Sequence, residues 1–559
     1  MSLFFKLKML KNMSRKLLNT LSPRKVLSYI VALCVIAPVL SLLTIALTGN
    51  LAHWDNLLHY VIPEVSLNTL QLLVGVAIIV SLLGAGSAWI TSAYDFPSKK
   101  ILLWALLLPL AIPTYIMAFA YLDLLHPLGP IQTTIRDILN ISSPREFRLP
   151  DIRGIWGAIF IMGLALYPYV YLSTRIMFIS QPMNLIEAAR TLGYSHREAF
   201  YYIIIPMARP ALAVGISLAL METLNDIGAS EFLGVRTLTV AIYNEWVTRS
   251  NLTGAAQIAI IMLLIVSLLL YIEKNSRLHH RYANTQKLKP ISPQKITGYK
   301  AVILMILCWI PVVCGFLLPV LYLLSETTKR WQGFKQLSAN LLSSTFNTVL
   351  LASIATLFTV LLGIFIVWVQ RMNSRNQHYS LSKINSFGYA IPGTILAIGL
   401  LSPFVIMDNF IDWILNIFFY VPSQLYIMGS IAGLVIAYCI RFLAISIGSI
   451  ESGYARIPLS LDNAASTLGY NSYQIFGYIH LPLLKSAIGV SSLLVFVDAM
   501  KELSATLLLR PLNFETLSTL LYAEAARGTY EDGAIAALLI VVVGILPVII
   551  LAKTQHSQA

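Results

Sequence analysis

Charged side chains are scarce in this sequence. Asp, Glu, Lys and Arg make up 11% of the 559 residues, hydrophobic residues make up 57%, and the mean hydropathy is +0.75. A water-soluble chain could not cover so much apolar surface, because large exposed apolar patches aggregate. The apolar residues form runs of about 20, the length of a bilayer-crossing helix, and the short alternating segments of membrane barrels are missing. The composition therefore predicts an all-α, polytopic membrane protein.

Cysteine is also rare. Cys34, Cys308, Cys314 and Cys439 all lie inside apolar runs, where they are expected to be small buried hydrophobic residues. This excludes a disulfide or cysteine-based metal framework. We predict no cofactor, and the sequence assigns no metal site.

The phosphate-binding pattern Gly-x-x-x-x-Gly-Lys-Ser/Thr does not occur in the 559 residues. We therefore expect no ATP site on this chain, and any ATP-driven process would need a separate subunit.

Lysine and arginine give the chain a net charge of +14 and cluster in two segments, 1–25 and 273–300. Both segments flank apolar runs, as the positive-inside rule predicts for cytoplasmic segments. A nucleic-acid surface would need a soluble domain to display it, so no nucleic-acid partner is expected. The first apolar run, 26–48, is too long for a signal-peptide core and should remain as a membrane span.

Apolar runs between charged or Pro/Gly-rich breaks predict twelve spans, with both termini in the cytoplasm. The predicted spans are 26–48, 66–90, 101–122, 154–176, 208–226, 255–272, 302–324, 346–370, 386–407, 426–449, 485–508 and 533–552.

The sequence repeats itself. Asn68-Thr69 recurs as Asn347-Thr348, Ile112-Pro113 as Ile391-Pro392, and Thr237-Leu238 with Tyr243 as Thr516-Leu517 with Tyr522, all at one constant offset. Leu192-Gly193-Tyr194 recurs as Leu468-Gly469-Tyr470 at a slightly smaller offset, as small loop insertions in a duplicated gene would leave. Six spans per half give both halves the same orientation. The predicted organisation is a basic N-terminus 1–25, a first six-helix domain 26–272, a linker 273–300, a second six-helix domain 301–553 and a tail 554–559.

The segment between the fourth and fifth spans of each half follows one pattern of small, capping and proline residues. The residues are Glu187, Ala188, Ala189, Gly193 and Pro206 in the first half, and Asn463, Ala464, Ala465, Gly469 and Pro482 in the second. We refer to 187–206 and 463–482 as the first and second elbow.

Local chemistry predicts two short helices in each elbow. Capping-box spacing at Asn184/Glu187, and more weakly at Ser460/Asn463, would start the first helix, and the glycine would end it in a left-handed conformation. Ser195/Glu198 and Asn471/Gln474 would cap the second helix, which the proline would stop. The paired alanines leave a surface that another protein can approach closely.

The first elbow resembles the signature loop of binding-protein-dependent ABC importer permeases: Glu-Ala-Ala, three residues, Gly, nine residues, and Ile-x-Leu-Pro, with Ile205 in place of Leu. In the second elbow Asn463 replaces the Glu. The resemblance covers nearly the whole chain and implies the type I importer permease fold in its fused two-half form. It also implies that the elbows are coupling helices that dock on an ABC ATP-binding subunit, expected as a dimer. A periplasmic solute-binding protein and an inner-membrane location follow from it too.

Three stretches are most similar to ferric-iron permeases: Tyr94-Asp95-Phe96-Pro97, Leu108–Pro113 and Met221–Asp226. The resemblance therefore implies uptake of ferric iron by alternating access. Thiamine, 2-aminoethylphosphonate and polyamine permeases share the architecture and remain alternatives. A twelve-span secondary transporter is the alternative of a different class, but it has no need of a duplicated cytoplasmic elbow.

Four acids end the fifth and eleventh spans at matching places: Glu222 and Asp226 in the first half, and Asp498 and Glu502 in the second, at the smaller offset. Carboxylates near hydrocarbon are costly and suit hard cations, so we interpret them as a candidate translocation pathway. Hydration at the span end, or local pairing such as Asp498 with Lys501, is the alternative. His480 is expected to be a surface residue rather than a metal ligand.

Overall fold

The computed structural model describes residues 23–49, 54–180, 191, 193–195, 198, 202, 204–278, 293–331, 339–372, 387–419 and 424–556. Within them the fold is all-helical apart from one pair of two-residue strands, which confirms the predicted fold class. The Cα positions divide into two compact units, a smaller one of residues 1–44, 349–499 and 509–512, and a larger one of 45–348, 500–508 and 513–559.

The described residues include eleven helices long and apolar enough to span a membrane, or twelve if one bent pair counts as a span. The bent pair is the predicted span 101–122, which consists of Lys99–Ala111 and Thr114–Leu124 at an angle of 92°. Proline causes this difference: Ile112 is extended before Pro113, which cannot donate a backbone hydrogen bond.

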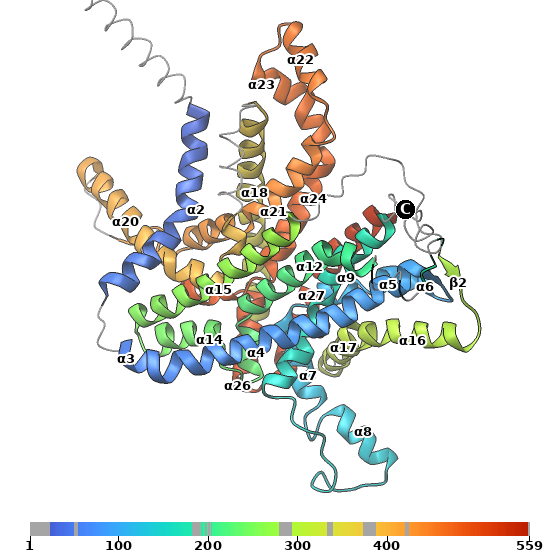
Figure 1. The fold of residues 1–559 in the computed structure, drawn as a ribbon. Coiled ribbons are helices and arrows are strands. Elements are labelled where there is room, and N and C mark those ends of the chain that lie inside the picture. The colour runs from blue at the N-terminus through green and yellow to red at the C-terminus, as the bar shows by residue number, and fades with distance from the viewer. Residues whose placement is uncertain are drawn as a thin grey trace, which may run out of the picture. The chain divides into compact units, whose positions relative to one another are not determined.

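The smaller unit is a bundle of long helices that carries the second elbow at one end (Figure 1). Its helices are α2 (Pro23–Thr48), α18 (Ala339–Met372), α20 (Gly393–Phe419), α21 (Ile431–Tyr454), α22 (Leu459–Thr467), α23 (Ser472–Ile475) and α24 (Leu481–Met500), of which α2, α18 and α24 extend by a few residues beyond it.

The larger unit contains most of the first half together with the seventh and twelfth spans. Its helices are α3 (Trp54–Asn56), α4 (Ile62–Val80), α5 (Gly86–Ala93), α6 (Lys99–Ala105), α7 (Thr114–Leu124), α8 (Pro130–Ile138), α9 (Ile155–Ser180), α12 (Ile205–Asn225), α13 (Gly228–Phe232), α14 (Leu238–Tyr243), α15 (Leu252–Leu278), α16 (Tyr299–Val312), α17 (Leu318–Trp331), α25 (Ser504–Leu509), α26 (Leu517–Arg527) and α27 (Tyr530–His556).

Helix α9 forms the centre of the larger unit and packs against α4, α5 and α12. Its Tyr167 and Tyr171 are fully buried. Because helices in lipid gain little from the hydrophobic effect, such close packing holds the bundle together.

The duplication is visible in local structure. A short 3₁₀ turn, Leu108–Ala111, precedes Ile112-Pro113, and an equivalent turn, Phe387–Ala390, precedes Ile391-Pro392. The 3₁₀ turn before Ile-Pro therefore recurs in both halves, and each Ile-Pro is followed by a new helix, α7 or α20.

A second repeated device ties α14 and α26 to long spans. Asn68 donates to the Arg236 carbonyl at 3.2 Å, and Asn347 donates to the Glu515 carbonyl at 3.1 Å. The hydroxyls of Thr69 and Thr348 accept from the first N–H of α14 and α26, at 3.0 and 2.8 Å. The two helices are equivalent elements anchored by equivalent hydrogen bonds.

A buried carboxylate organises the entry to α21. Asp408 is 1% exposed and accepts hydrogen bonds from the N–H groups of Tyr426, Ile427 and Met428, at 3.1, 2.8 and 3.0 Å. Three donors offset the cost of burying the carboxylate.

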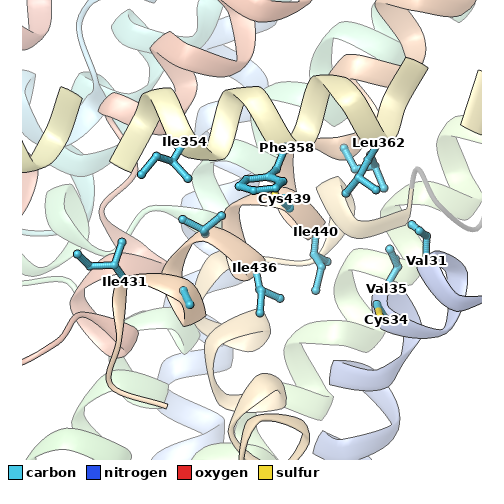
Figure 2. A pocket seen from close by; sticks show the side chains of 13 residues that line it. Val31, Cys34, Val35, Ile354, Phe358, Leu362, Ile431, Ile436, Cys439 and Ile440 are labelled. Carbon is cyan, nitrogen blue, oxygen red and sulfur yellow. The ribbon is translucent and has the colours of Figure 1, made fainter. Parts of the chain in front are cut away.

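An apolar groove of about 550 Å³ lies in the smaller unit between α2, α18 and α21 (Figure 2). Val35, Phe358 and Ile436 are among its lining residues, and its lining side chains that carry a heteroatom are Cys34 and Cys439. Cys34 is exposed, so the prediction that it is buried is wrong. A groove so poor in hydrogen-bonding groups suits hydrocarbon and offers nothing to a hydrated ion.

The loop after α5 and the segment before α16 pair as parallel strands, β1 (Tyr94–Asp95) with β2 (Gln294–Lys295). Lys99 donates to the Tyr94 carbonyl at 2.7 Å. The pairing requires both segments to lie on the same side of the membrane.

This pairing and the basic residues beside it predict the orientation of the chain. Reporter fusions at Lys100 and Lys300 should both score cytoplasmic, and a fusion at Asp137 should score periplasmic, because basic loops are retained inside. Alkaline phosphatase and green fluorescent protein fusions measure this. Opposite signals from Lys100 and Lys300 would contradict the strand pairing.

Candidate functional site

The second elbow is described throughout. Helix α22 starts after Pro458 and ends at Leu468 and Gly469, whose φ is +87°. The Tyr470 N–H donates to the Ala465 carbonyl at 3.1 Å and the Gly469 N–H donates to the Ser466 carbonyl at 3.1 Å. This is a Schellman ending, and it confirms that glycine supplies the left-handed turn.

The predicted capping box of the second helix is present in each elbow. The Asn471 side chain accepts from Gln474 N–H at 2.9 Å, and the Gln474 side chain accepts from Asn471 N–H at 2.9 Å. In the first elbow Glu198 accepts from Ser195 N–H at 2.7 Å, and Ser195 accepts from Glu198 N–H at 3.3 Å. The backbone and hydroxyl hydrogen bonds from Ser195 lower the pKa of Glu198.

The first elbow repeats the second where it is described. Gly193 has φ of +92°. Tyr194 and Tyr202 have ring centroids 6.4 Å apart, and their equivalents Tyr470 and Tyr478 are 6.3 Å apart. Glu187, Ala188 and Ala189 lie outside the described residues. Pro206 is the second residue of α12 and follows a helical Ile204, so the prediction that it stops a helix is wrong.

Two predictions for the second elbow are wrong. Ser460 and Asn463 do not start α22, because Pro458 precedes its first residue and no side chain caps it. Pro482 does not stop the helix, which continues as α24. A π turn over Phe476–His480 precedes the proline. Its i→i+5 hydrogen-bond pattern lets the helix continue although Pro482 has no N–H group to donate.

Helix α22 and the glycine turn that follows it expose apolar side chains outside the candidate spans. Leu459, Leu461 and Leu468 are 61%, 40% and 77% exposed, while Asn463 and Ala464 beside them are exposed and Ala465 packs inward at 5%. Exposed leucines in a water-facing segment indicate a protein contact.

A polar network fixes α22 to the ends of its neighbouring spans. Arg371 at the end of α18 pairs with Asp462 on α22 (Nε to Oδ2, 2.9 Å) and donates to the Ile457 carbonyl at 2.9 Å. Asp462 also bonds His480 Nε2 at 3.0 Å, and Tyr454 bonds His480 Nδ1 at 3.2 Å. Arg371 lies over the Tyr454 ring, 5.6 Å from its centroid.

Electrostatics make this network stabilising. Partial burial opposes ionisation of Asp462, but hydrogen bonds from Arg371 and His480 and their charges lower its pKa overall. His480 is 2% exposed, so the prediction of a surface histidine is wrong. The sequence could not show that its ring turns inward to Asp462 and Tyr454.

The network was missed because it is not repeated. The positions equivalent to Arg371, Tyr454, Asp462 and His480 are Ser92, Phe178, Ile186 and Ile204. The second half has four polar residues where the first half has three apolar residues and a serine. A comparison of the two halves could therefore have pointed to the network.

The four predicted pathway acids occupy equivalent places at the ends of α12 and α24. Asp226, 9% exposed, accepts from Ala229 N–H at 2.7 Å, and Glu502, 6% exposed, accepts from Ala505 N–H at 2.7 Å. Each carboxylate satisfies the start of the short helix after the break, α13 or α25. Glu222 and Asp498 are half-buried one turn earlier.

The network makes a prediction about stability. Replacing Arg371 by Ser should lower the thermal unfolding midpoint in detergent, because hydrogen bonds to charged groups contribute about 1.5–3 kcal/mol. Ser92→Ala, the equivalent site without the network, should have little effect. An unfolding midpoint equal to that of the wild type in Arg371→Ser would contradict the assignment.

Lowering the pH should remove the contribution that the Asp462 carboxylate makes to the stability of the folded protein. Because the folded-state pKa is lowered, the stabilisation is present above the unfolded pKa, about 4, and is lost as pH falls through the folded value. The gap in unfolding midpoint between wild type and Asp462→Asn should therefore narrow as pH falls below about 4. A gap independent of pH would exclude this account.

Comparison with known proteins finds one family model and several relatives. Residues 81–275 match the family model of the binding-protein-dependent transport system inner membrane component. The chain is 24% identical over 500 residues to the Fe(3+)-transport system permease protein FbpB 2 of Haemophilus influenzae, covering 88% of this chain and 90% of that protein.

Shorter relatives match part of the chain. The molybdenum transport system permease protein ModB of Escherichia coli K12 is 28% identical over 193 residues, 34% of this chain and 81% of ModB. The putative 2-aminoethylphosphonate transport system permease protein PhnU of Salmonella choleraesuis is 26% identical over 203 residues, 36% of this chain and 70% of PhnU. Residues 81–275 therefore form a binding-protein-dependent transport system inner membrane component, and the chain is a multi-pass permease of the inner membrane, with two repeated halves in one polypeptide, that is similar to FbpB 2 over most of its length.

Proposed function

We propose that this permease carries ferric iron into the cytoplasm, driven by a separate ATPase dimer that docks on the two elbows and supplied by a periplasmic binding protein. Both termini would lie in the cytoplasm, and the linker 273–300 would join domains 26–272 and 301–553. The family itself implies an ATPase and a binding protein as partners.

The structure of the second elbow supports the docking role. Helix α22 is held at its base by Arg371 and ends in a defined glycine turn, so it can transmit force rather than bend. Its exposed leucines and the small Ala464 present a surface for a partner groove. The first elbow shares the glycine turn and the tyrosine pair.

Coupling can be tested at the turn glycines. Gly193→Pro, Gly469→Val and Glu187→Arg should abolish transport and ATPase stimulation while membrane insertion remains normal, because the first two forbid the left-handed turn and the third reverses a charge on the docking surface. Gly448→Ala in α21, outside both elbows, is the control, since a side chain there meets open space. Normal transport in all three variants would remove the coupling assignment.

The duplicated acids are the observation that favours a cationic solute. Glu222 and Asp498 lie half-buried at the ends of α12 and α24 furthest from the elbows. Carboxylate oxygens are ligands that hard cations prefer. They disfavour an anionic phosphonate, whereas thiamine and polyamines, which are cations, remain to be separated by experiment.

Iron transport is tested in proteoliposomes that contain the permease, its ATPase and its binding protein. Uptake of ⁵⁵Fe³⁺ should exceed that of thiamine or spermidine, and Glu222→Gln with Asp498→Asn should reduce it about tenfold, a loss of ~1.4 kcal/mol. Asp137→Asn, an exposed acid away from α12 and α24, is the control.

Asp226→Asn with Glu502→Gln removes two charges and keeps oxygen acceptors for the Ala229 and Ala505 N–H groups. Reduced iron uptake with normal expression would assign these charges to the pathway, and unchanged uptake would leave them a structural role alone. Uptake of another solute in place of iron would overturn the ferric proposal.

A further inference from the structure

Two equivalent tyrosines meet in the larger unit. Tyr243 ends α14 and Tyr522 lies in α26, and the larger offset of the repeat relates them. Their ring centroids are 6.4 Å apart with the planes at 74°, an edge-on contact. In a two-fold arrangement a residue contacts its own copy only on the symmetry axis. The tyrosine pair therefore marks the axis that relates α14 to α26.

The breaks after α12 and α24 also meet there. Ser504 donates its hydroxyl to the Asn225 carbonyl at 2.7 Å, and Tyr115 donates to the Lys501 carbonyl at 3.4 Å. A Cβ on Gly228 would lie 2.6 Å from the Tyr115 Cβ and 2.9 Å from a Leu503 methyl. Gly228 and Ser504 are equivalents by the smaller offset of the repeat. The two breaks are therefore in direct contact at this point.

One carboxylate holds the tyrosine pair. The Tyr522 hydroxyl donates to the Glu231 carboxylate, and the Phe232 ring stacks on Tyr522 with centroids 5.6 Å apart. A hydroxyl–carboxylate hydrogen bond is charge-assisted and strong when shielded from water, and Tyr522 is 8% exposed. The two offsets of the repeat match Glu231 with Leu507 or with Arg510, so only the first half supplies this acid.

We propose that Tyr243, Tyr522 and Glu231 form the closed gate of the translocation pathway at the end of α12 remote from the elbow. The pathway of a two-half permease must use the surface the halves share, because polar solutes avoid lipid. Opening then requires the Tyr522–Glu231 hydrogen bond to break and the tyrosines to part. The inference depends on the permease role and not on which solute is carried.

The role of the Tyr522–Glu231 hydrogen bond in holding the gate closed can be tested without a known solute. If ATP favours the open gate, weakening the closed gate must favour the ATP-bound state, because coupling is reciprocal. In the purified permease–ATPase complex at subsaturating ATP, where the rate follows ATP affinity, Tyr522→Phe and Glu231→Gln should raise basal ATP hydrolysis about fivefold or more, the lower end of the usual coupling between sites.

Tyr322→Phe is the matched control. Tyr322 is 3% exposed and donates to Asp123 at 2.6 Å, the same pairing in the same unit but away from the tyrosine pair. Its basal hydrolysis should equal that of the wild type. Equal basal rates in Tyr522→Phe, Glu231→Gln and Tyr322→Phe would show that the Tyr522–Glu231 hydrogen bond does not hold the gate closed.

A crosslink tests the gate itself. In a chain whose native cysteines are replaced, with a protease site inserted in 279–292, Tyr243→Cys and Tyr522→Cys should crosslink on oxidation or with a short bis-methanethiosulfonate. The crosslink should hold the two fragments together after cleavage and suppress ATP hydrolysis until a reductant is added. Asn68→Cys with Arg236→Cys, a contact within one fragment, should not hold the fragments together.

The outcomes are distinct from those of the iron assay. Absence of the inter-fragment crosslink would refute the axial contact. A crosslink that leaves hydrolysis unchanged would refute the gate while preserving the contact. Failure of iron uptake with a functioning crosslink would remove the ferric proposal alone.

Discussion

Peptide groups freed where a membrane helix is interrupted have no water to bind in hydrocarbon, and the structure depends on how each interruption is satisfied. The bend at Pro113 uses a 3₁₀ turn, the proline at 482 uses a π turn, and the breaks after α12 and α24 use Asp226 and Glu502. Polar residues in this chain therefore concentrate where helices stop, and function can be built at those places without further burial of charge.

The two elbows share a scaffold but differ in how it is held. Glycine turns, capping boxes and tyrosine pairs recur in both, whereas the ion pair and histidine under α22 occur only in the second. The first half has Phe178 and Ile204 at equivalent positions, which are 3% and 2% exposed. The second elbow is thus anchored by charge, and salt and acid should weaken that anchor, whereas the first half has uncharged, buried side chains at two of the equivalent positions.

Features governed by local chemistry could be predicted from the sequence. The span positions follow from apolar runs, and the turns at Gly193 and Gly469 follow from glycine and capping spacing. Features that depend on tertiary contact could not. To predict the burial of His480 one must know that α18, α21 and α22 converge. The helix continues beyond Pro482 because of a π turn, which no residue pattern predicts. The repeat shows that Tyr243 and Tyr522 are equivalent residues, but only the structure shows that their rings are in contact.

Glu231 has no equivalent acid in the second half, although the tyrosine it binds is itself one of a duplicated pair. In a permease assembled from two identical chains, every substitution enters both sides of the axis at once. Joining the halves in one gene removes that restriction. The fused chain can place a donor on one side and an acceptor on the other, so complementarity across the axis becomes available to natural selection one residue at a time.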